Sequence, residues 1–355
     1  MKSEAANLKG LEDSPYHNKT GPLVVEYSQY RTGLVHEWIK AAREAGYKLT
    51  DYNGESQLGV SYVQSTTKSG KRWSAAKAFI EPIRARPNLQ VMTFTSVTKV
   101  LISNSTKEAY GVEYVYRRKR YTALSRKEVI ISAGAFNSPQ ILMLSGIGPL
   151  DNLNAIEVPV YKELPVGKTM YDHMCHAGPI FVTNTIGNSL KVQDLTINDV
   201  KNYLLNRPSK INVIGGVEAL AFHKVNMSDT PDDLPDVEQI FVSGSFASDL
   251  GTGLKEGANI RDDLYNAVYK PLEFKREDHF STLIMQFHPK SRGRLWLHNR
   301  NPFEPPRIDP KYFKNPEDIE ILLAGIKESI KIVEQPALKK IGTRLHDIPL
   351  PGKSV

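Results

Sequence analysis

Apolar residues recur at helical spacing in two stretches of the chain. The first stretch follows Thr32, a favourable N-cap, and ends at Gly46. The second begins after Asn315-Pro316 and ends before Pro336. Its spacing predicts an amphipathic helix whose inner face holds Ile319, Leu322, Leu323, Ile326, Ile330 and Val333.

Short β-branched and aromatic runs separated by turn residues dominate the region after Asn88. They predict a sheet with an inserted meander, with strands at Leu89–Phe94, Ser96–Ile102, Ala109–Tyr116 and Tyr121–Leu124. Before this region, strands are expected at Gly21–Ser28 and Gln57–Val63. After it, helices are expected at Thr196–Asn206 and Ile260–Tyr269, and strands at Glu238–Phe246 and Thr282–Phe287.

One stretch, from Lys127 to Pro149, combines a strand pattern with a helix pattern. Val129–Ile131 has no polar break, which predicts a strand buried on both faces of a mainly parallel sheet. The small residues Ser132 to Ala135 then allow a flat ligand to approach. Ser138 is the expected N-cap of the following helix, with Pro139 at its first position.

Composition and charge are those of an ordinary globular chain. With 355 residues, 40% hydrophobic and 24% charged, the chain is long enough for two domains. The net charge of +7 is dispersed, and the densest basic run, Arg117–Arg120, falls where a hairpin turn is expected. We therefore expect no nucleic-acid partner.

Cysteine content and hydropathy limit the remaining classes. The single cysteine, Cys175, excludes an internal disulfide framework and a cysteine-based metal site. No apolar stretch is long enough for a transmembrane segment, and the first thirty residues contain no signal-peptide core. Sequons at Asn18, Asn104 and Asn226 favour an extracellular, secreted location for the complete protein.

The motif within Lys127–Pro149 is more specific than its secondary structure. Gly134-Ala135, Ser138-Pro139 and Ser145-Gly146-Ile147-Gly148 stand at the spacing of the second signature of the glucose–methanol–choline (GMC) flavoprotein oxidoreductases, which this stretch resembles. Leu164–His173 resembles the family's Val-Gly-x-Asn-Leu-x-Asp-His, although Thr169 replaces the asparagine. Pro289–Leu297 resembles the start of the family's substrate-binding region, most of all in its insect glucose dehydrogenase-like branch.

The resemblance implies a fold and a chemistry. The fold would be α/β and α+β: an incomplete Rossmann-like FAD-binding domain in residues 1–175, and a substrate-binding domain in residues 176–355. The latter would hold an antiparallel-type sheet with helices on one face. The cofactor would be FAD, contacted by Val97 and by the small-residue turn of Ala133, Gly134 and Ala135. The reaction would be hydride transfer from the CH–OH group of an alcohol or sugar to flavin N5, with a quinone or oxygen as electron acceptor.

Two features of this family have no counterpart in the sequence. No Gly-x-Gly-x-x-Gly turn is present, because Asp151 follows Gly146 and Gly148 at the third position and Glu256 follows Gly251 and Gly253. The family's catalytic histidine would lie beyond the last residues, so no catalytic residue is predicted and the chain is expected to be an inactive fragment or truncated form, whose first sheet exposes apolar surface. The alternative is a catalytically inactive relative that acts as a binding or structural module.

Two other sources of catalysis find no support in the sequence. Adjacent residues such as Asp172 and His173 seldom converge on one substrate atom, which argues against an acid–base pair there. An α/β hydrolase is excluded because the sequence has no Gly-x-Ser-x-Gly elbow.

Overall fold

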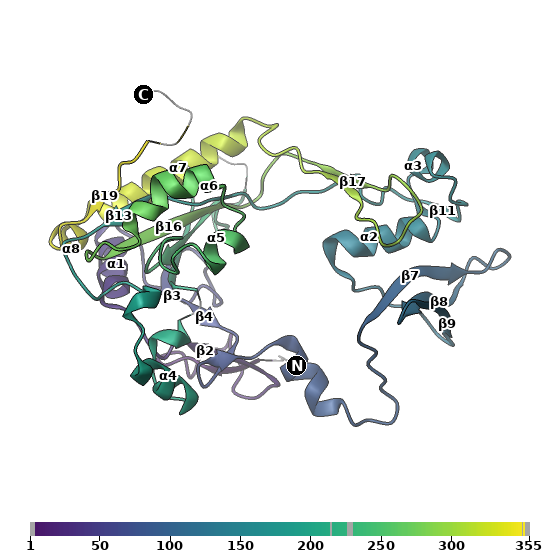
Figure 1. The fold of residues 1–355 in the computed structure, drawn as a ribbon, viewed down its shortest axis with the longest axis horizontal. Coiled ribbons are helices and arrows are strands. Elements are labelled where there is room, and N and C mark those ends of the chain that lie inside the picture. Colours follow the sequence, from purple (N-terminus) through teal and green to yellow (C-terminus); the bar gives the residue numbers. More distant parts are fainter. Residues whose placement is uncertain (1–3, 214, 226–229, 350, 352–355) are drawn as a thin grey trace. The chain divides into compact units, whose positions relative to one another are not determined.

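The computed structural model describes residues 4–213, 215–225, 230–349 and 351 (Figure 1). The Asn226 sequon lies outside the described residues, whereas Asn104 is exposed. The chain divides into two compact units, each built from separate stretches of sequence. Unit 1 comprises residues 1–85, 173–288 and 319–355, and unit 2 comprises residues 86–172 and 289–318.

Unit 1 is built around a mostly antiparallel sheet of seven strands in the order β19-β13-β16-β15-β14-β3, with β12 also paired to β16. These strands are β3 (Gly59–Tyr62), β12 (Cys175–His176), β13 (Ile180–Val182), β14 (Val217–His223), β15 (Val237–Val242), β16 (His279–Gln286) and β19 (Arg344–Leu345). A smaller sheet contains β1 (Glu4–Asn7), β2 (Leu23–Tyr27) and β4 (Gln64–Ser65), and β5 (Thr67–Lys68) pairs with β6 (Lys71–Arg72). The helices are α1 (Gly33–Glu44), α4 (Ile197–Leu204), α5 (Gly253–Gly257), α6 (Asp262–Leu264), α7 (Glu317–Val333) and α8 (Pro336–Lys339).

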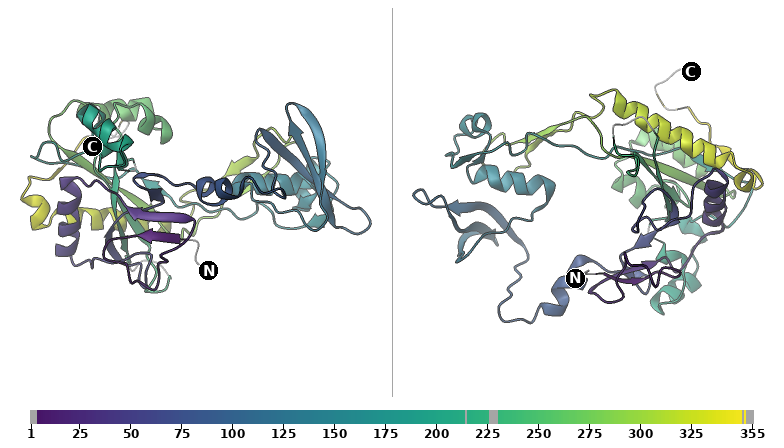
Figure 2. Two further views of the ribbon diagram at one scale, coloured as in Figure 1. Left: turned by 90° about the horizontal axis from the view of Figure 1, so that it is seen from below. Right: turned by 180° about the vertical axis from the view of Figure 1, so that it is seen from behind.

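Helices α1, α7 and α8 cover one face of this sheet (Figures 1 and 2). Because side chains alternate along a strand, Phe181 faces these helices while Ile180 and Val182 pack on the other side against residues 247–272. Thr32 caps α1 as predicted, its hydroxyl accepting from the amide of Val35 at 3.3 Å. An antiparallel-type sheet carrying helices is thus confirmed for this part of the chain.

The buried face of α7 differs from the predicted face. Leu322 and Val333 are buried as expected, but Ile319 and Leu323 are 42% and 51% exposed. The buried stripe instead includes Gly325, where an added Cβ would lie 2.7 Å from side-chain atoms of Ile284 and Val237. Since α7 is apolar on two sides, close approach to the sheet selects the face that contains glycine.

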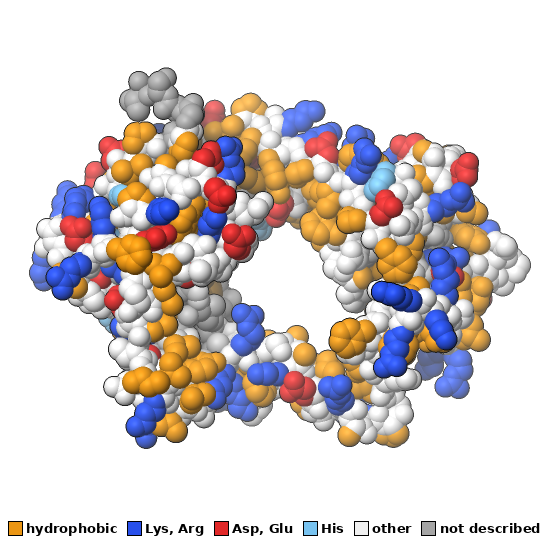
Figure 3. Space-filling model, viewed as in Figure 1, with side chains coloured by type: hydrophobic (Ala, Val, Ile, Leu, Met, Phe, Trp, Pro, Cys, Tyr) orange, Lys and Arg blue, Asp and Glu red, His pale blue; other side chains and the backbone are white. Residues whose placement is uncertain are grey.

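Unit 2 contains an antiparallel meander of β7 (Thr95–Ile102), β8 (Ala109–Tyr116) and β9 (Lys119–Leu124), as the sequence predicts. Arg117 and Arg118 form its turn at positive φ, and Lys and Arg side chains are distributed over the face drawn in Figure 3. The other elements are α2 (Gly134–Leu144), β10 (Ile147–Gly148), α3 (Leu150–Ala155), β11 (Lys162–Glu163), β17 (Arg294–Trp296) and β18 (Arg307–Asp309). Unit 2 leaves large apolar side chains exposed, among them Phe94 at 94% and Leu124 at 76%.

Three predictions for this unit are wrong. Leu89–Phe94 forms no strand, and neither does Val129–Ile131, whose Ile130 is 78% exposed. A doubly buried parallel strand needs a paired neighbour, and none of the described strands pairs with residues 129–131. Helix α2 begins at Gly134, so Ser138 is not its N-cap and Pro139 lies inside the helix.

The two units do not follow the single domain boundary that the sequence suggests at residues 175 and 176. The chain crosses between them next to His173, but β3 and α1 join the sheet of unit 1 although both precede that point. The roles proposed for residues 1–175 and 176–355 stay predictions.

Candidate functional site

Unit 2 contains a cavity of about 490 Å³ at the predicted cofactor-binding turn. Strands β7 and β8, the segment before α2, the helix itself and a loop near residue 302 form its walls. The lining residues are Thr95, Ser96, Val97, Val100, Val112, Val129, Ile130, Ile131, Ser132, Ala133, Asn137, Gln140, Ile141, Leu144, Pro302 and Phe303. This volume is within the usual range for small-molecule sites.

Two buried polar side chains fasten the walls to one another. The Ser145 hydroxyl, at the end of α2, accepts from the Val100 amide at 2.8 Å and donates to the Ile141 carbonyl at 2.6 Å. Gln140 Nε2 donates to the Glu304 carbonyl at 2.7 Å, which connects α2 to the loop that carries Phe303. The helix, strand β7 and the loop therefore hold the cavity open from three directions.

The structure brings together two of the four predicted cofactor residues. Val97, on β7 and 40% exposed, lines the cavity together with Ala133. Gly134 and Ala135 lie directly after Ala133, at the exposed start of α2, but do not line the cavity.

The turn at Gly134 has a conformation that suits glycine. Gly134 has φ +89°, in the left-handed region, and an added Cβ there would meet no atom within 4 Å. The Ala133 amide donates to Ser138 Oγ at 3.0 Å, which closes the turn from inside the helix. The space beside Gly134 is therefore open to a ligand.

The residues that line the cavity are suited to binding a ligand and not to acid–base catalysis. Its lining residues include no acid, no base and no cysteine, but they include the amides of Asn137 and Gln140 and several hydroxyls. Apolar walls with a few polar groups suit a flat, uncharged molecular surface.

Sequence reasoning missed several of these residues. Gln140 is the one polar side chain between Pro139 and Leu144, which was an available signal for a buried contact. Phe303 gave no signal, because only the fold brings residues 302 and 303 against α2.

Asp172 and His173 point to different partners. Asp172 accepts from the Tyr312 hydroxyl at 2.8 Å, and the His173 ring stands 4.9 Å from the ring of Phe287. The two side chains therefore contact different neighbours and not each other. Among the described residues, no group of His, Cys, Asp and Glu could hold a metal ion, and no helix is long and apolar enough to cross a membrane.

Comparisons with known proteins agree with the motifs. Two family models, both described as GMC oxidoreductase, match residues 5–175 and 289–354. Glucose dehydrogenase [FAD, quinone] of Drosophila pseudoobscura pseudoobscura is 34% identical over 342 residues, which cover 95% of this chain and 51% of that protein. Alcohol dehydrogenase [acceptor] of Pseudomonas putida is 32% identical and covers 93% of this chain and 56% of its own length. The chain thus spans about half the length of the curated relatives that it matches.

Solved structures show the same fold. Pyridoxine 4-oxidase from Mesorbium loti superposes with a TM-score of 0.72 at 22% identity, covering 99% of this chain and 60% of that one. A formate oxidase superposes with a TM-score of 0.76 at 21% identity, covering 98% and 61%.

Proposed function

Since the chain belongs to the GMC oxidoreductase family, we propose that the whole protein oxidises the CH–OH group of an alcohol or sugar with FAD as cofactor. The observation that supports this most directly is the cavity of unit 2, which joins Val97 to Ala133 at the predicted turn. The names of the glucose dehydrogenase and alcohol dehydrogenase relatives support a small alcohol or sugar as substrate, and the name of the glucose dehydrogenase supports a quinone as electron acceptor. Oxygen is the alternative acceptor.

The residues of the cavity fit one end of FAD. Val97 and Ala133 offer apolar contacts to the faces of a flat ring such as adenine, and Asn137 carries an amide group suited to its edge. Gly134 and Ala135 follow Ala133 at the turn and would contact the cofactor there, and the space beside Gly134 is open. When bound, FAD supplies the two-electron acceptor, at flavin N5, for the hydride that leaves the alcohol carbon.

The pyrophosphate of FAD finds no comparable support in these residues. A dinucleotide fold holds this group with the backbone of a Gly-x-Gly-x-x-Gly turn at a helix N-terminus, and the sequence contains no such turn. The cavity alone is therefore expected to bind the adenosine part weakly.

A second candidate function is a catalytically inactive relative that binds a nucleotide or a partner. It is favoured by the absence of any acid or base among the described residues that line the cavity. The two functions differ in turnover, which can be measured directly.

The test compares two variants of the whole protein. Val97→Trp fills the cavity, whereas Val91→Trp places the same side chain at an exposed position of unit 2 outside it. We expect Val97→Trp to lower both flavin content and alcohol-dependent quinone reduction by at least about tenfold, and Val91→Trp to leave both unchanged. Flavin binding without turnover on any alcohol or sugar would favour the inactive relative, and flavin content unaffected by Val97→Trp would overturn the site.

A further inference from the structure

A second cavity, of about 860 Å³, lies wholly within unit 1. It is formed by the N-terminal segment, the end of β2, the residues before α1 and the sheet edge at β3. Its lining includes three tyrosines, Tyr27, Tyr30 and Tyr62, and the basic residues Lys9, Arg31 and His36.

Arg31 has an unusual environment in this cavity. Its guanidinium lies over the ring of Tyr62, 3.7 Å from the centroid, and 5.2 Å from the centroid of the Tyr27 ring. Because both tyrosines end β-strands, they form a fixed platform that holds the guanidinium in one orientation. Tyr62 is fixed further by a 2.8 Å hydrogen bond between its hydroxyl and His36 Nδ1.

The guanidinium has no acidic partner among the described residues, and it makes no hydrogen bond or ion pair there. Stacking uses only the faces of the group, so its N–H donors, which lie in the plane of the group, are left for a ligand. Arginine is the side chain best suited to bind a carboxylate or phosphate through two parallel hydrogen bonds.

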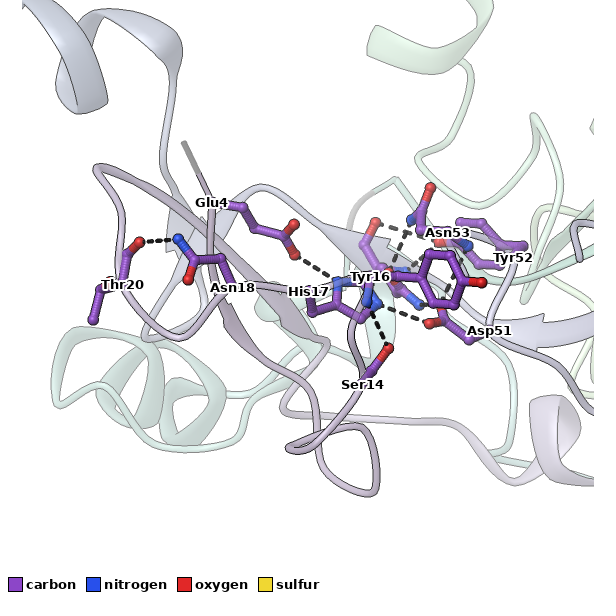
Figure 4. Close-up of polar contacts among 10 residues, drawn as sticks. Glu4, Ser14, Tyr16, His17, Asn18, Thr20, Asp51, Tyr52 and Asn53 are labelled. Carbon is purple, nitrogen blue, oxygen red and sulfur yellow. Dashed lines mark hydrogen bonds and ion pairs between the residues drawn. The ribbon is translucent and has the colours of Figure 1, made fainter. Parts of the chain in front are cut away.

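The nearby acids are occupied by other donors. Asp51 lines the same cavity, but its Oδ2 lies 2.9 Å from His17 Nε2 and its Oδ1 accepts from Gln64 Nε2 at 2.8 Å (Figure 4). The other ring nitrogen of His17 lies 2.7 Å from Glu4 Oε1 (Figure 4). These contacts hold the Asp51 carboxylate in a network of its own and away from Arg31.

The buried carboxylate of Glu218 is likewise satisfied. It accepts from the Thr32 amide at 2.7 Å and the Thr32 hydroxyl at 2.6 Å, and also from the Ser243 hydroxyl. Neither Asp51 nor Glu218 therefore forms an ion pair with Arg31, whose N–H donors stay available to a ligand.

We propose that Arg31, stacked on Tyr62 and Tyr27, binds an oxyanion, which is the carboxylate or phosphate group of a small molecule. Lys9, on the N-terminal segment of the lining, is a second basic residue of the same cavity. This site lies in unit 1 and uses none of the residues proposed to contact FAD, so its failure would leave the proposed function intact.

Calorimetric titration with sodium benzoate and with inorganic phosphate, at constant ionic strength, tests the site. Loss of a charge-assisted contact typically weakens binding by about tenfold or more. We expect Arg31→Met to weaken binding of the preferred anion by that factor. Arg43→Met removes an exposed arginine of α1 outside the cavity and is expected to change nothing. Preference for benzoate identifies a carboxylate beside a planar group, and preference for phosphate identifies a phosphate ester.

A second measurement needs no variant. Phenylglyoxal modifies accessible arginines, and peptide mapping reports each one separately. We expect millimolar benzoate or phosphate to slow the modification of Arg31 and not that of Arg43. The proposal is overturned if the chain binds neither anion at millimolar concentration, or if Arg31→Met and Arg43→Met weaken binding equally.

Discussion

At the residue scale, Gly134 and Gly187 form a matched pair of glycines. Both have positive φ, +89° and +84°, and an added Cβ would meet no atom within 4 Å at either position. Valine at either site should therefore strain the backbone by a similar amount, about 1–2 kcal/mol. Only Gly134→Val places its branched side chain next to the cavity at Ala133, so it alone should lower the flavin content of the whole protein. Equal loss of bound flavin in the two variants would show that the turn at Gly134 does not contact the cofactor.

Two buried histidines make the stability of unit 1 dependent on pH. Burial lowers the pKa of His223 to about 4 and that of His279 to about 3, and neither ring has a hydrogen-bond partner among the described residues. Lys331 adds to the shift of His223, which Glu328 opposes.

Since an unfolded histidine takes up a proton near pH 6.5, the unfolded state binds more protons below that pH. The free energy of unfolding should therefore fall as the pH drops below 6.5, by about 2 kcal/mol per histidine at pH 5. Urea unfolding at pH 8 and pH 5 measures this loss. Replacing His279 by Phe should make it smaller, and an unchanged loss would contradict the assignment.

At the element scale, the two neighbouring leucines of α7 differ in burial. Leu322 is 8% exposed and Leu323 is 51% exposed, although the sequence pattern predicted both on the inner face. Leu322→Glu would bury a carboxylate against the sheet and should cost about 3 kcal/mol or more. Leu323→Glu should change the free energy of unfolding by less than about 0.5 kcal/mol. If urea denaturation gave similar losses of unfolding free energy for the two variants, Leu323 would be as buried as Leu322, as the sequence pattern predicted.

Local elements followed from the sequence, while elements that depend on distant partners did not. The β7–β8–β9 meander and α1 are specified by neighbouring residues, through the turn at Arg117 and Arg118 and the cap at Thr32. Val129–Ile131 has the composition of a central strand, but a strand exists only beside another strand. The family resemblance likewise predicted Val97 and Ala133, which line one cavity, whereas Phe303 reaches that cavity through tertiary packing alone.

At the scale of the whole molecule, the 355-residue chain expressed alone should not retain FAD. The cavity offers contacts to an adenine ring, but the pyrophosphate charges would lack the backbone amides and helix dipole of a glycine-rich turn. Purified chain should therefore show no stoichiometric flavin absorbance after desalting. Yellow protein with one flavin per chain would contradict this prediction.

The interleaving of the two units has a consequence for biosynthesis. The core of unit 1 joins Leu34 of α1 to Leu338 of α8, with all of unit 2 encoded between them. During translation, unit 2 can complete its contacts once residue 318 has left the ribosome, whereas the sheet of unit 1 must wait for α7, α8 and β19. Contacts so distant in sequence form slowly, so the nascent segment of residues 1–85 carries the unpaired apolar face of α1 until residues 319–355 have been made. Chaperone demand should accordingly be set by residues 1–85, and a ribosome stalled when residue 318 has just emerged would display a finished unit 2 on an unfinished unit 1.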